Sequence, residues 1–324
     1  MSDRSALADA FLKRAGWGNA TRHVLAGDAS HRRYDRLTAP QDGATAVLMD
    51  APPEKGEDVR PFIRIAGHLA KLGLSPPRII AEDAENGFLL LEDLGDDLFA
   101  RVIPARPEIE ETLYAAATDL LAQLHRHPLP DGLATYSPPL MADLAALAID
   151  WYLPGANASR PDAPVRNAFQ AETETVLSRV AAEAPVLILR DYHAENLLWL
   201  PGCSGVARVG LLDFQDAMAG HPAYDLVSLL QDARRDVPDT LREAMIARYL
   251  AATGRDDARF RQAFATLGAQ RNLRILGVFT RLCLRDGKPH YTDLLPRVWA
   301  DLERNLAHPA LSGVKRMVAE HLPA

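Results

Sequence analysis

The sequence has few cysteines, no long apolar run and no excess of basic residues. Its two cysteines, Cys203 and Cys283, lie far apart and lack the spacing of metal ligands, so we expect a reducing compartment and no structural disulfide. No stretch of about eighteen apolar residues occurs, which predicts that no segment spans a membrane. The net charge of −7 gives no basic footprint for nucleic acid. Charges at Asp3 and Arg4 argue against a signal peptide, so we expect a cytoplasmic protein that binds neither nucleic acid nor membranes.

The amino-terminal third of the chain predicts a small antiparallel sheet. With 324 residues, of which 48% are hydrophobic, the chain can bury a substantial core and divide into two lobes. Short segments separated by turn residues predict an antiparallel meander, and apolar residues at helical spacing predict one main helix within it. The expected helices are 5–15 and 58–72, and the expected strands are 21–25, 33–37, 44–49, 78–81 and 87–91.

From Pro107 onward the hydrophobic pattern becomes helical. We therefore expect an α+β fold with a boundary near Gly95. Its amino-terminal lobe, 1–94, would hold a five-stranded antiparallel sheet with one main helix, and its carboxy-terminal lobe, 95–324, would be mostly helical. The expected helices of the second lobe are 108–125, 143–151, 165–182, 241–252, 260–284 and 292–306, interrupted by strand-like runs at 186–189 and 206–212.

Three polar residues near the middle of the chain have the layout of a phosphoryl-transfer site. Asp191 is followed five residues later by Asn196, and a short apolar strand then ends in Asp213-Phe214. In this layout the first Asp orients the attacking hydroxyl as catalytic base, and the Asn and second Asp hold Mg²⁺ on the nucleotide phosphates. Taken singly, Asp191 could be a solvated loop residue and Asn196 a turn cap, so the prediction depends on their combined spacing.

The same region resembles a known enzyme family. Segments 190–197, 210–217 and 224–237 are similar to the aminoglycoside and choline kinases, which are the small-molecule branch of the protein-kinase-like fold. They resemble more narrowly the bacterial N-acetylmuramate/N-acetylglucosamine anomeric kinases of cell-wall recycling. The resemblance implies a two-lobed protein-kinase-like fold, ATP as co-substrate, Mg²⁺ as cofactor, and an amino sugar phosphorylated at its anomeric hydroxyl. Phosphorylation of an aminoglycoside, choline or another sugar stays open, as does a kinase-like protein that binds without catalysis.

The nucleotide side departs from the kinase pattern. The third strand has Met49 or Asp50 where most kinases have Lys, and helix 58–72 has no Glu to pair with it. One of Arg32 and Arg33 could supply the missing charge, and strand alternation allows only one of them to face the nucleotide. Lys55, Arg60 and Arg64 are the next candidates, although each basic group could simply be solvated. The predicted nucleotide-binding residues are Gly27, Ser30, Arg32 and Arg33 in the phosphate turn, with Glu92 and Leu94 at the hinge.

Further residues around the loop are predicted to bind the acceptor or to support the loop. The resemblance implies that Asp225 supports the catalytic loop by hydrogen bonding, and that Gln215, which replaces the Gly of Asp-Phe-Gly, fixes the metal loop. An Arg near the acceptor would suit the lactyl carboxylate of N-acetylmuramate. The candidates for sugar hydroxyls and the acetamido group are Glu195, Gln215, Asp216, Arg271 and Asn272, with Asp232, Arg234 and Arg235 as weaker ones and a surface role open for each.

Overall fold

The structure is a computed structural model that describes residues 4–27, 31–157 and 162–323. The chain forms two compact units, one from Met1–Pro107 with Glu195–Asp216 and the other from Glu108–Ala194 with Ala217–Ala324. Each unit is discontinuous in sequence. The chain returns to the first unit at Glu195, after the predicted catalytic loop (residues 190–194), and leaves it again after Asp216. The assignment of nucleotide binding to residues 1–94 and of substrate binding to 95–324 stays a prediction.

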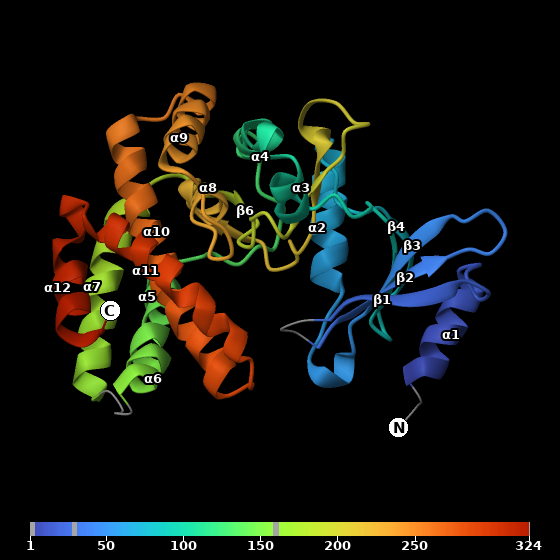
Figure 1. The fold of residues 1–324 in the computed structure, drawn as a ribbon, viewed down its shortest axis with the longest axis horizontal. Helices are drawn as coiled ribbons and strands as arrows, with labels where there is room; N and C mark the ends of the chain where they lie inside the picture. The colour runs from blue at the N-terminus through green and yellow to red at the C-terminus, as the bar shows by residue number, and fades with distance from the viewer. Residues whose placement is uncertain (1–3, 28–30, 158–161, 324) are drawn as a thin grey trace. The chain divides into compact units, whose positions relative to one another are not determined.

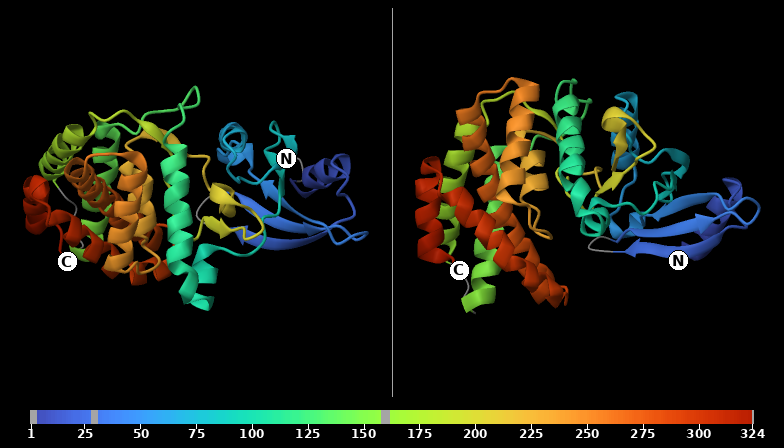
Figure 2. Two further views of the ribbon diagram at one scale, coloured as in Figure 1. Left: turned by 90° about the horizontal axis from the view of Figure 1, so that it is seen from above. Right: turned by 45° about the horizontal axis from the view of Figure 1, so that its top comes forward.

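The first unit is built on an antiparallel sheet of order β1-β2-β3-β5-β4. One face is covered by α1 (Arg4–Arg14), whose Phe11 stacks on Phe88 with ring centroids 5.7 Å apart. Figure 2 shows this sheet in blue with α1 beside it. The predicted five-stranded sheet is thus confirmed. Its strands are β1 (Thr21–Gly27), β2 (Arg33–Thr38), β3 (Thr45–Asp50), β4 (Ile79–Asp83) and β5 (Phe88–Glu92).

The main helix of the first unit, α2 (Arg60–Lys71), begins with a proline in its first turn and buries one apolar face. Proline is well suited to that position because the N–H it lacks would have no partner inside the helix. Phe62 from the buried face packs against Phe214, with ring centroids 4.7 Å apart. Beyond the helix, Ser75 O accepts a 2.9 Å hydrogen bond from Leu211 N. These two contacts tie the loop that follows Leu211 to α2.

A two-stranded sheet, β7 (Leu197–Trp199) paired with β8 (Val209–Leu211), completes the first unit together with α3 (Phe99–Ala105). The expected strand 206–212 is shorter in the structure, because Gly205–Arg208 forms a 3-10 turn before it. Strand β7 and helix α3 were not predicted from the sequence. Both are short, and a few apolar residues in a row do not by periodicity alone distinguish a strand from a helix.

The second unit is helical and is organised around α10 (Asp257–Leu284), which contacts α5, α7, α8 and α11 (Figure 1). A Cβ on Gly277 would meet the backbone carbonyl carbon of Leu147 at 2.3 Å, so glycine lets α10 approach the segment after α5 closely. The other helices are α4 (Glu110–Leu124), α5 (Pro138–Ala145), α6 (Leu153–Asn157), α7 (Ala163–Val180), α8 (Ala223–Leu230), α9 (Asp239–Thr253), α11 (Leu295–Leu306) and α12 (Ser312–His321).

The helix expected at 143–151 differs most from the structure. Helix α5 begins earlier, at Pro138 with a second proline beside it, and a π-helical segment, Ala148–Tyr152, follows it. A two-stranded sheet pairs β6 (Val186–Ile188) with β9 (Met218–Gly220) on either side of the catalytic loop. In the described part of the chain, none of the helices combines the length and apolarity that crossing a membrane requires.

Candidate active site

The catalytic loop of the second unit is held by a buried carboxylate. Asp225, in the first turn of α8, is fully buried and accepts hydrogen bonds from Leu189 N at 2.6 Å and Arg190 N at 2.9 Å. Burial raises the pKa of Asp225 to about 7, against the two backbone N–H donors, which lower it. Arg190 has a φ of 71°, a conformation that costs a non-glycine residue free energy. The two hydrogen bonds offset that cost and fix the backbone that leads into Asp191, as predicted for a supporting Asp225.

The rest of the loop is anchored to neighbouring helices of the same unit. Tyr192 is buried, and its Oη donates to Ala117 O in α4 at 2.8 Å. Ala194 N donates to Asp232 Oδ2 at 3.4 Å, so Asp232 supports the loop. His193 is also buried, and burial lowers its pKa to about 4. Asp191 is thus the half-buried member of a loop whose next three side chains are buried.

The predicted metal ligands lie together in the first unit. Leu212 N donates to Asn196 O at 2.9 Å, which places the backbone of Asn196 beside the end of β8 and next to Asp213. Asp213 has a φ of 56° and an exposed side chain. Gln215 Nε2 donates to Asp213 Oδ1 at 2.7 Å, and Phe214 between them is buried. An exposed carboxylate and a neighbouring amide are oxygen donors of the kind that Mg²⁺ prefers, so the residues present fit this cation.

The prediction that Gln215 contacts the sugar stays a prediction, and the structure shows a second contact for its side chain. It is buried, and its amide orients the carboxylate of Asp213. Asp216 and Glu195, also predicted for the sugar, are both exposed on the first unit. The carboxylates of Asp213 and Asp216 are thus the accessible acidic groups of this loop.

The two arginines of the phosphate turn have different environments. Arg32 forms a 2.8 Å ion pair with Glu57, and the side chains of both are at most 15% exposed. Arg33 is 58% exposed and pairs with Asp35 at 2.9 Å. Burial opposes the charge of Arg32, but the neighbouring groups, Tyr34 and Glu57 foremost, outweigh it and raise its pKa.

Tyr34 connects this basic group electrostatically with the metal loop. Burial raises the pKa of Tyr34 to about 12, Arg32 lowers it, and the charge of Asp213 raises it further. Asp216 in turn contributes to the raised pKa of Arg32. Within the first unit, one half-buried cation and the two exposed carboxylates therefore lie within electrostatic range of one another. Glu57 lies one residue before the expected helix 58–72, so the sequence pattern of a helix acid that pairs with the cation does not include it.

Two of the other predicted nucleotide-binding residues lie at the ends of strands, and a third follows soon after one. Gly27 ends β1, and Ser30 lies outside the described residues. Glu92 ends β5, and its Oε2 accepts from Arg78 N at 3.2 Å. Leu94 follows in the hinge and is half-buried.

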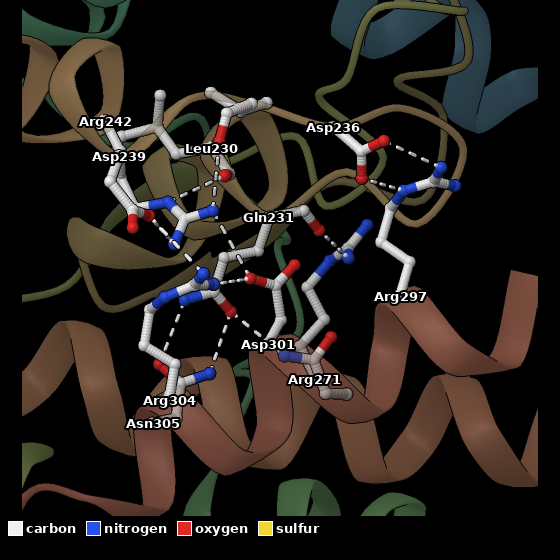
Figure 3. Close-up of polar contacts among 12 residues, drawn as sticks. Leu230, Gln231, Asp236, Asp239, Arg242, Arg271, Arg297, Asp301, Arg304 and Asn305 are labelled. Carbon is white, nitrogen blue, oxygen red and sulfur yellow. Dashed lines mark hydrogen bonds and ion pairs between the residues drawn. The ribbon is translucent and has the colours of Figure 1, made fainter.

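Arg271 and Asn272 belong to a buried polar network of the second unit, and Figure 3 shows Arg271, Gln231 and Asn305 of this network. Arg271 Nη1 donates to Gln231 O at 3.3 Å, and Asn272 Nδ2 donates to Gln231 Oε1 at 2.9 Å. Gln231 Nε2 donates in turn to Asn305 Oδ1 in α11 at 2.9 Å. Asn272 is 1% exposed and Arg271 5%, so in this conformation both side chains hold the end of α8 against α10 and α11.

Arg234 and Arg235, the weaker candidates for sugar binding, both contact side chains of the second unit. The guanidinium of Arg234 lies 5.9 Å from the ring centroid of Phe279. Arg235 pairs with Glu110 at 2.8 Å and donates to Tyr114 Oη at 3.0 Å. The sequence did not single out Arg274, which the structure places among tyrosines near Asp191. A helix of 28 residues with several arginines gives no sequence signal for which of them faces the site.

The sequence matches a protein family and several named proteins over most of its length. The profile of the family described as "phosphotransferase enzyme family" matches residues 21–262. A protein of Caulobacter vibrioides named N-acetylmuramate/N-acetylglucosamine kinase is 39% identical, over 99% of this chain and 98% of that protein. A protein of the same name from Pseudomonas aeruginosa is 34% identical, over 97% and 93%.

Solved structures with the same fold are more distant in sequence. A choline/ethanolamine kinase family protein from Mesorhizobium loti superimposes with a TM-score of 0.63 at 15% identity, over 98% of this chain and 100% of that one. The ADP-bound aminoglycoside phosphotransferase APH(2'')-Ib superimposes with a TM-score of 0.61 at 12% identity, over 93% and 98%. The expected protein-kinase-like fold is confirmed, and the chain belongs to the phosphotransferase enzyme family.

Proposed function

We propose that this protein is an ATP-dependent kinase that phosphorylates the anomeric hydroxyl of N-acetylmuramate and N-acetylglucosamine. The observation that carries the proposal is the 39% identity, across 99% of the chain, to a protein named as a kinase of these two sugars. Both are amino sugars of the bacterial cell wall, so the reaction would serve peptidoglycan recycling. We place it in the cytoplasm, where ATP is available.

On the acceptor side, Asp191 would act as the catalytic base. Its carboxylate accepts a hydrogen bond from the anomeric hydroxyl and orients the oxygen toward the γ-phosphorus. As the new O–P bond forms and the bond from the γ-phosphorus to ADP breaks, the hydroxyl proton passes to Asp191. The Asp225 clamp on Leu189 N and Arg190 N supports this role, because it fixes the backbone ahead of the base without help from a ligand.

On the nucleotide side, Asn196 and Asp213 would hold Mg²⁺. The ion would neutralise charge on the β- and γ-phosphates. Gln215 keeps one oxygen of Asp213 in place through its 2.7 Å hydrogen bond. Adenine would lie at the hinge near Glu92 and Leu94, with Gly27 and Ser30 in the phosphate turn.

Arg32 would supply the positive charge that other kinases take from a strand lysine. Its pairing with Glu57 supports this proposal, because the acid holds the guanidinium in one orientation while burial limits competition from water. The exposed Arg33, paired with Asp35, is the weaker candidate. Glu195 and Asp216 remain the proposed contacts for sugar hydroxyls, whereas Arg271 and Asn272 would act by keeping the α8 end in place.

The test is a substrate panel with purified protein. With Mg-ATP we expect ADP release with N-acetylmuramate and N-acetylglucosamine, and little with an aminoglycoside or choline. The product should show splitting of its anomeric proton by phosphorus in NMR spectra. Asp191→Asn serves as the matched inactive control. Turnover of choline or an aminoglycoside alone would redirect the assignment within the family, and binding of a sugar without ADP release would indicate a non-catalytic protein.

A further inference from the structure

Two tyrosines and two arginines of the second unit gather beside the catalytic loop. Tyr136 and Tyr224 meet edge to face with ring centroids 5.0 Å apart, and their hydroxyl oxygens are 3.4 Å apart. The guanidinium of Arg190 lies 5.5 Å from the ring centroid of Tyr136. Arg274 Nη1 donates to Tyr224 Oη at 3.4 Å. Both cations therefore contact the same pair of rings.

Arg274 also interacts electrostatically with the predicted base, Asp191. Burial opposes its charge, but Tyr224, Tyr136 and then Asp191 outweigh the burial and raise its pKa. Its side chain is half-buried, so part of the residue remains exposed to solvent. The hydrogen bond to Tyr224 Oη uses one of the five N–H donors of the guanidinium. A fixed, partly desolvated guanidinium is well suited to bind a carboxylate through two parallel hydrogen bonds.

The two proposed sugars differ in the chemistry that such a group would detect. N-acetylmuramate has a lactyl ether with a carboxylate, and N-acetylglucosamine has a neutral hydroxyl at the same ring position. We propose that Arg274 binds the lactyl carboxylate and thereby sets the preference between the two sugars. This inference rests on the proposed function, because it places the anomeric hydroxyl of the sugar at Asp191.

The same cluster disfavours the other acceptors of the fold. Aminoglycosides and choline are cationic, and two guanidinium groups beside the acceptor would repel them. Arg271, three residues earlier on α10, has a different environment, since it is 5% exposed and donates to the carbonyl of Gln231 (Figure 3). Helix α10 thus has one buried arginine, Arg271, that supports the fold, and one half-buried arginine, Arg274, almost a turn later.

The experiment compares both sugars in the wild type and in Arg274→Met, with the neutral methyl ester of N-acetylmuramate as a third substrate. In the wild type, kcat/KM for N-acetylmuramate should exceed that for its ester by about ten- to a hundredfold, the effect of one charge-assisted contact. In Arg274→Met that advantage should fall to about unity, while kcat/KM for N-acetylglucosamine changes by less than about threefold. The matched control is Arg259→Met, an exposed arginine roughly 22 Å earlier on the same helix, which should keep the wild-type ratios.

An equal loss with both sugars in Arg274→Met would overturn the inference and make Arg274 a positioning residue for Asp191. If Arg274→Met fails to fold, the wild type alone still tests the inference. A ratio near one between its kcat/KM values for N-acetylmuramate and for the methyl ester would overturn it. Tyr224→Phe should then lower that ratio partially, because it removes the oxygen that holds Arg274. A wild type that phosphorylates neither sugar refutes the proposed function itself. Activity on N-acetylglucosamine with no preference for the acid over its ester refutes only the role of Arg274.

Discussion

The catalytic loop and the metal loop are stabilised in opposite ways. In the catalytic loop the anchoring carboxylate, Asp225, is fully buried and bonds to backbone N–H groups. In the metal loop the carboxylate itself, Asp213, is exposed and is steadied by the side chain of Gln215. The first arrangement fixes a backbone through a buried acceptor, and the second orients a solvent-exposed carboxylate through a neighbouring amide. The difference separates a residue that shapes the site, Asp225, from one that we propose contacts the metal, Asp213.

The largest effect, on the binding of Mg-ATP, should come from replacing the exposed carboxylate of Asp213. Asp213→Ala removes the anionic oxygen proposed for Mg²⁺, so metal-dependent binding of ATP should be abolished while the free energy of unfolding changes little. Calorimetry with Mg-ATP and urea unfolding measure the two quantities. Gln215→Ala is the matched variant and should weaken binding only partially. Unchanged affinity in Asp213→Ala would remove this residue from the metal site.

Asp191→Asn should lower kcat by about 10²- to 10⁴-fold, the range for loss of a positioned base. Because the Asp225 clamp fixes the loop backbone, the fold and the affinity for ATP should remain close to those of the wild type. Steady-state kinetics with N-acetylglucosamine measure the loss. A variant with half of the wild-type turnover would exclude Asp191 from the mechanism.

Asp225→Ala tests the buried side of the comparison. It leaves the N–H groups of Leu189 and Arg190 without their acceptor, at a cost of about 1–3 kcal/mol for each. We expect a lower free energy of unfolding in urea together with a lower kcat, in contrast to Asp191→Asn, which should affect kcat alone. Asp225→Asn, which keeps one acceptor oxygen, should be intermediate. Full stability in Asp225→Ala would show that the clamp does not hold the loop.

Arg32→Ala and Arg33→Ala should differ in their effect on ATP. Loss of a charge-assisted bond to phosphate costs about 1.5–3 kcal/mol, which raises KM for ATP roughly ten- to a hundredfold. We expect that increase for the half-buried Arg32 and a near-normal KM for the exposed Arg33. Glu57→Gln should raise KM less than Arg32→Ala does. Two near-normal arginine variants would shift the search to Lys55, Arg60 and Arg64.

The smallest expected effect is on how the free energy of unfolding depends on pH, through a buried histidine of the second unit. Burial lowers the pKa of His125 to about 3, and its Nδ1 lies 2.7 Å from Tyr249 Oη. Below about pH 6.5 the unfolded chain binds a proton at this residue that the native state does not, so stability falls as the pH falls. The loss should reach about 2 kcal/mol at pH 5.

His125→Gln should remove that part of the pH dependence between pH 7 and 5, measured as the change in the free energy of unfolding in urea. His23→Gln, at an exposed position in β1 of the other unit, is the matched control and should leave the dependence unchanged. An unchanged slope in His125→Gln would show that the buried imidazole does not contribute.

Much of the fold could be predicted because its signals are local. Turn residues and apolar spacing located the five strands and most of the helices. The pairing of β6 with β9 joins two three-residue strands about thirty residues apart, for which no local pattern exists. Early onset of α5 at Pro138 was missed because paired prolines were not interpreted as a helix start.

The site could be predicted where chemistry follows spacing along the chain, and not where it depends on packing. Asp191, Asn196 and Asp213 were singled out by their intervals. Gln215 was assigned to the sugar because the sequence does not show that its amide points back to Asp213. Likewise, α10 has Arg271 and Arg274 three residues apart, and only the packed structure distinguishes the buried one from the accessible one.

The left-handed backbone of Arg190 and Asp213 has a consequence for selection in the laboratory. In the described residues, these are the two positions other than glycines with positive φ. Glycine would relieve about 1 kcal/mol or more at each, so a screen for heat resistance alone should favour Gly at Arg190 and Gly at Asp213. Such variants would lose a guanidinium beside the base or the proposed metal ligand. In this enzyme, selection for thermal stability and selection for turnover should therefore act in opposite directions at the same two positions.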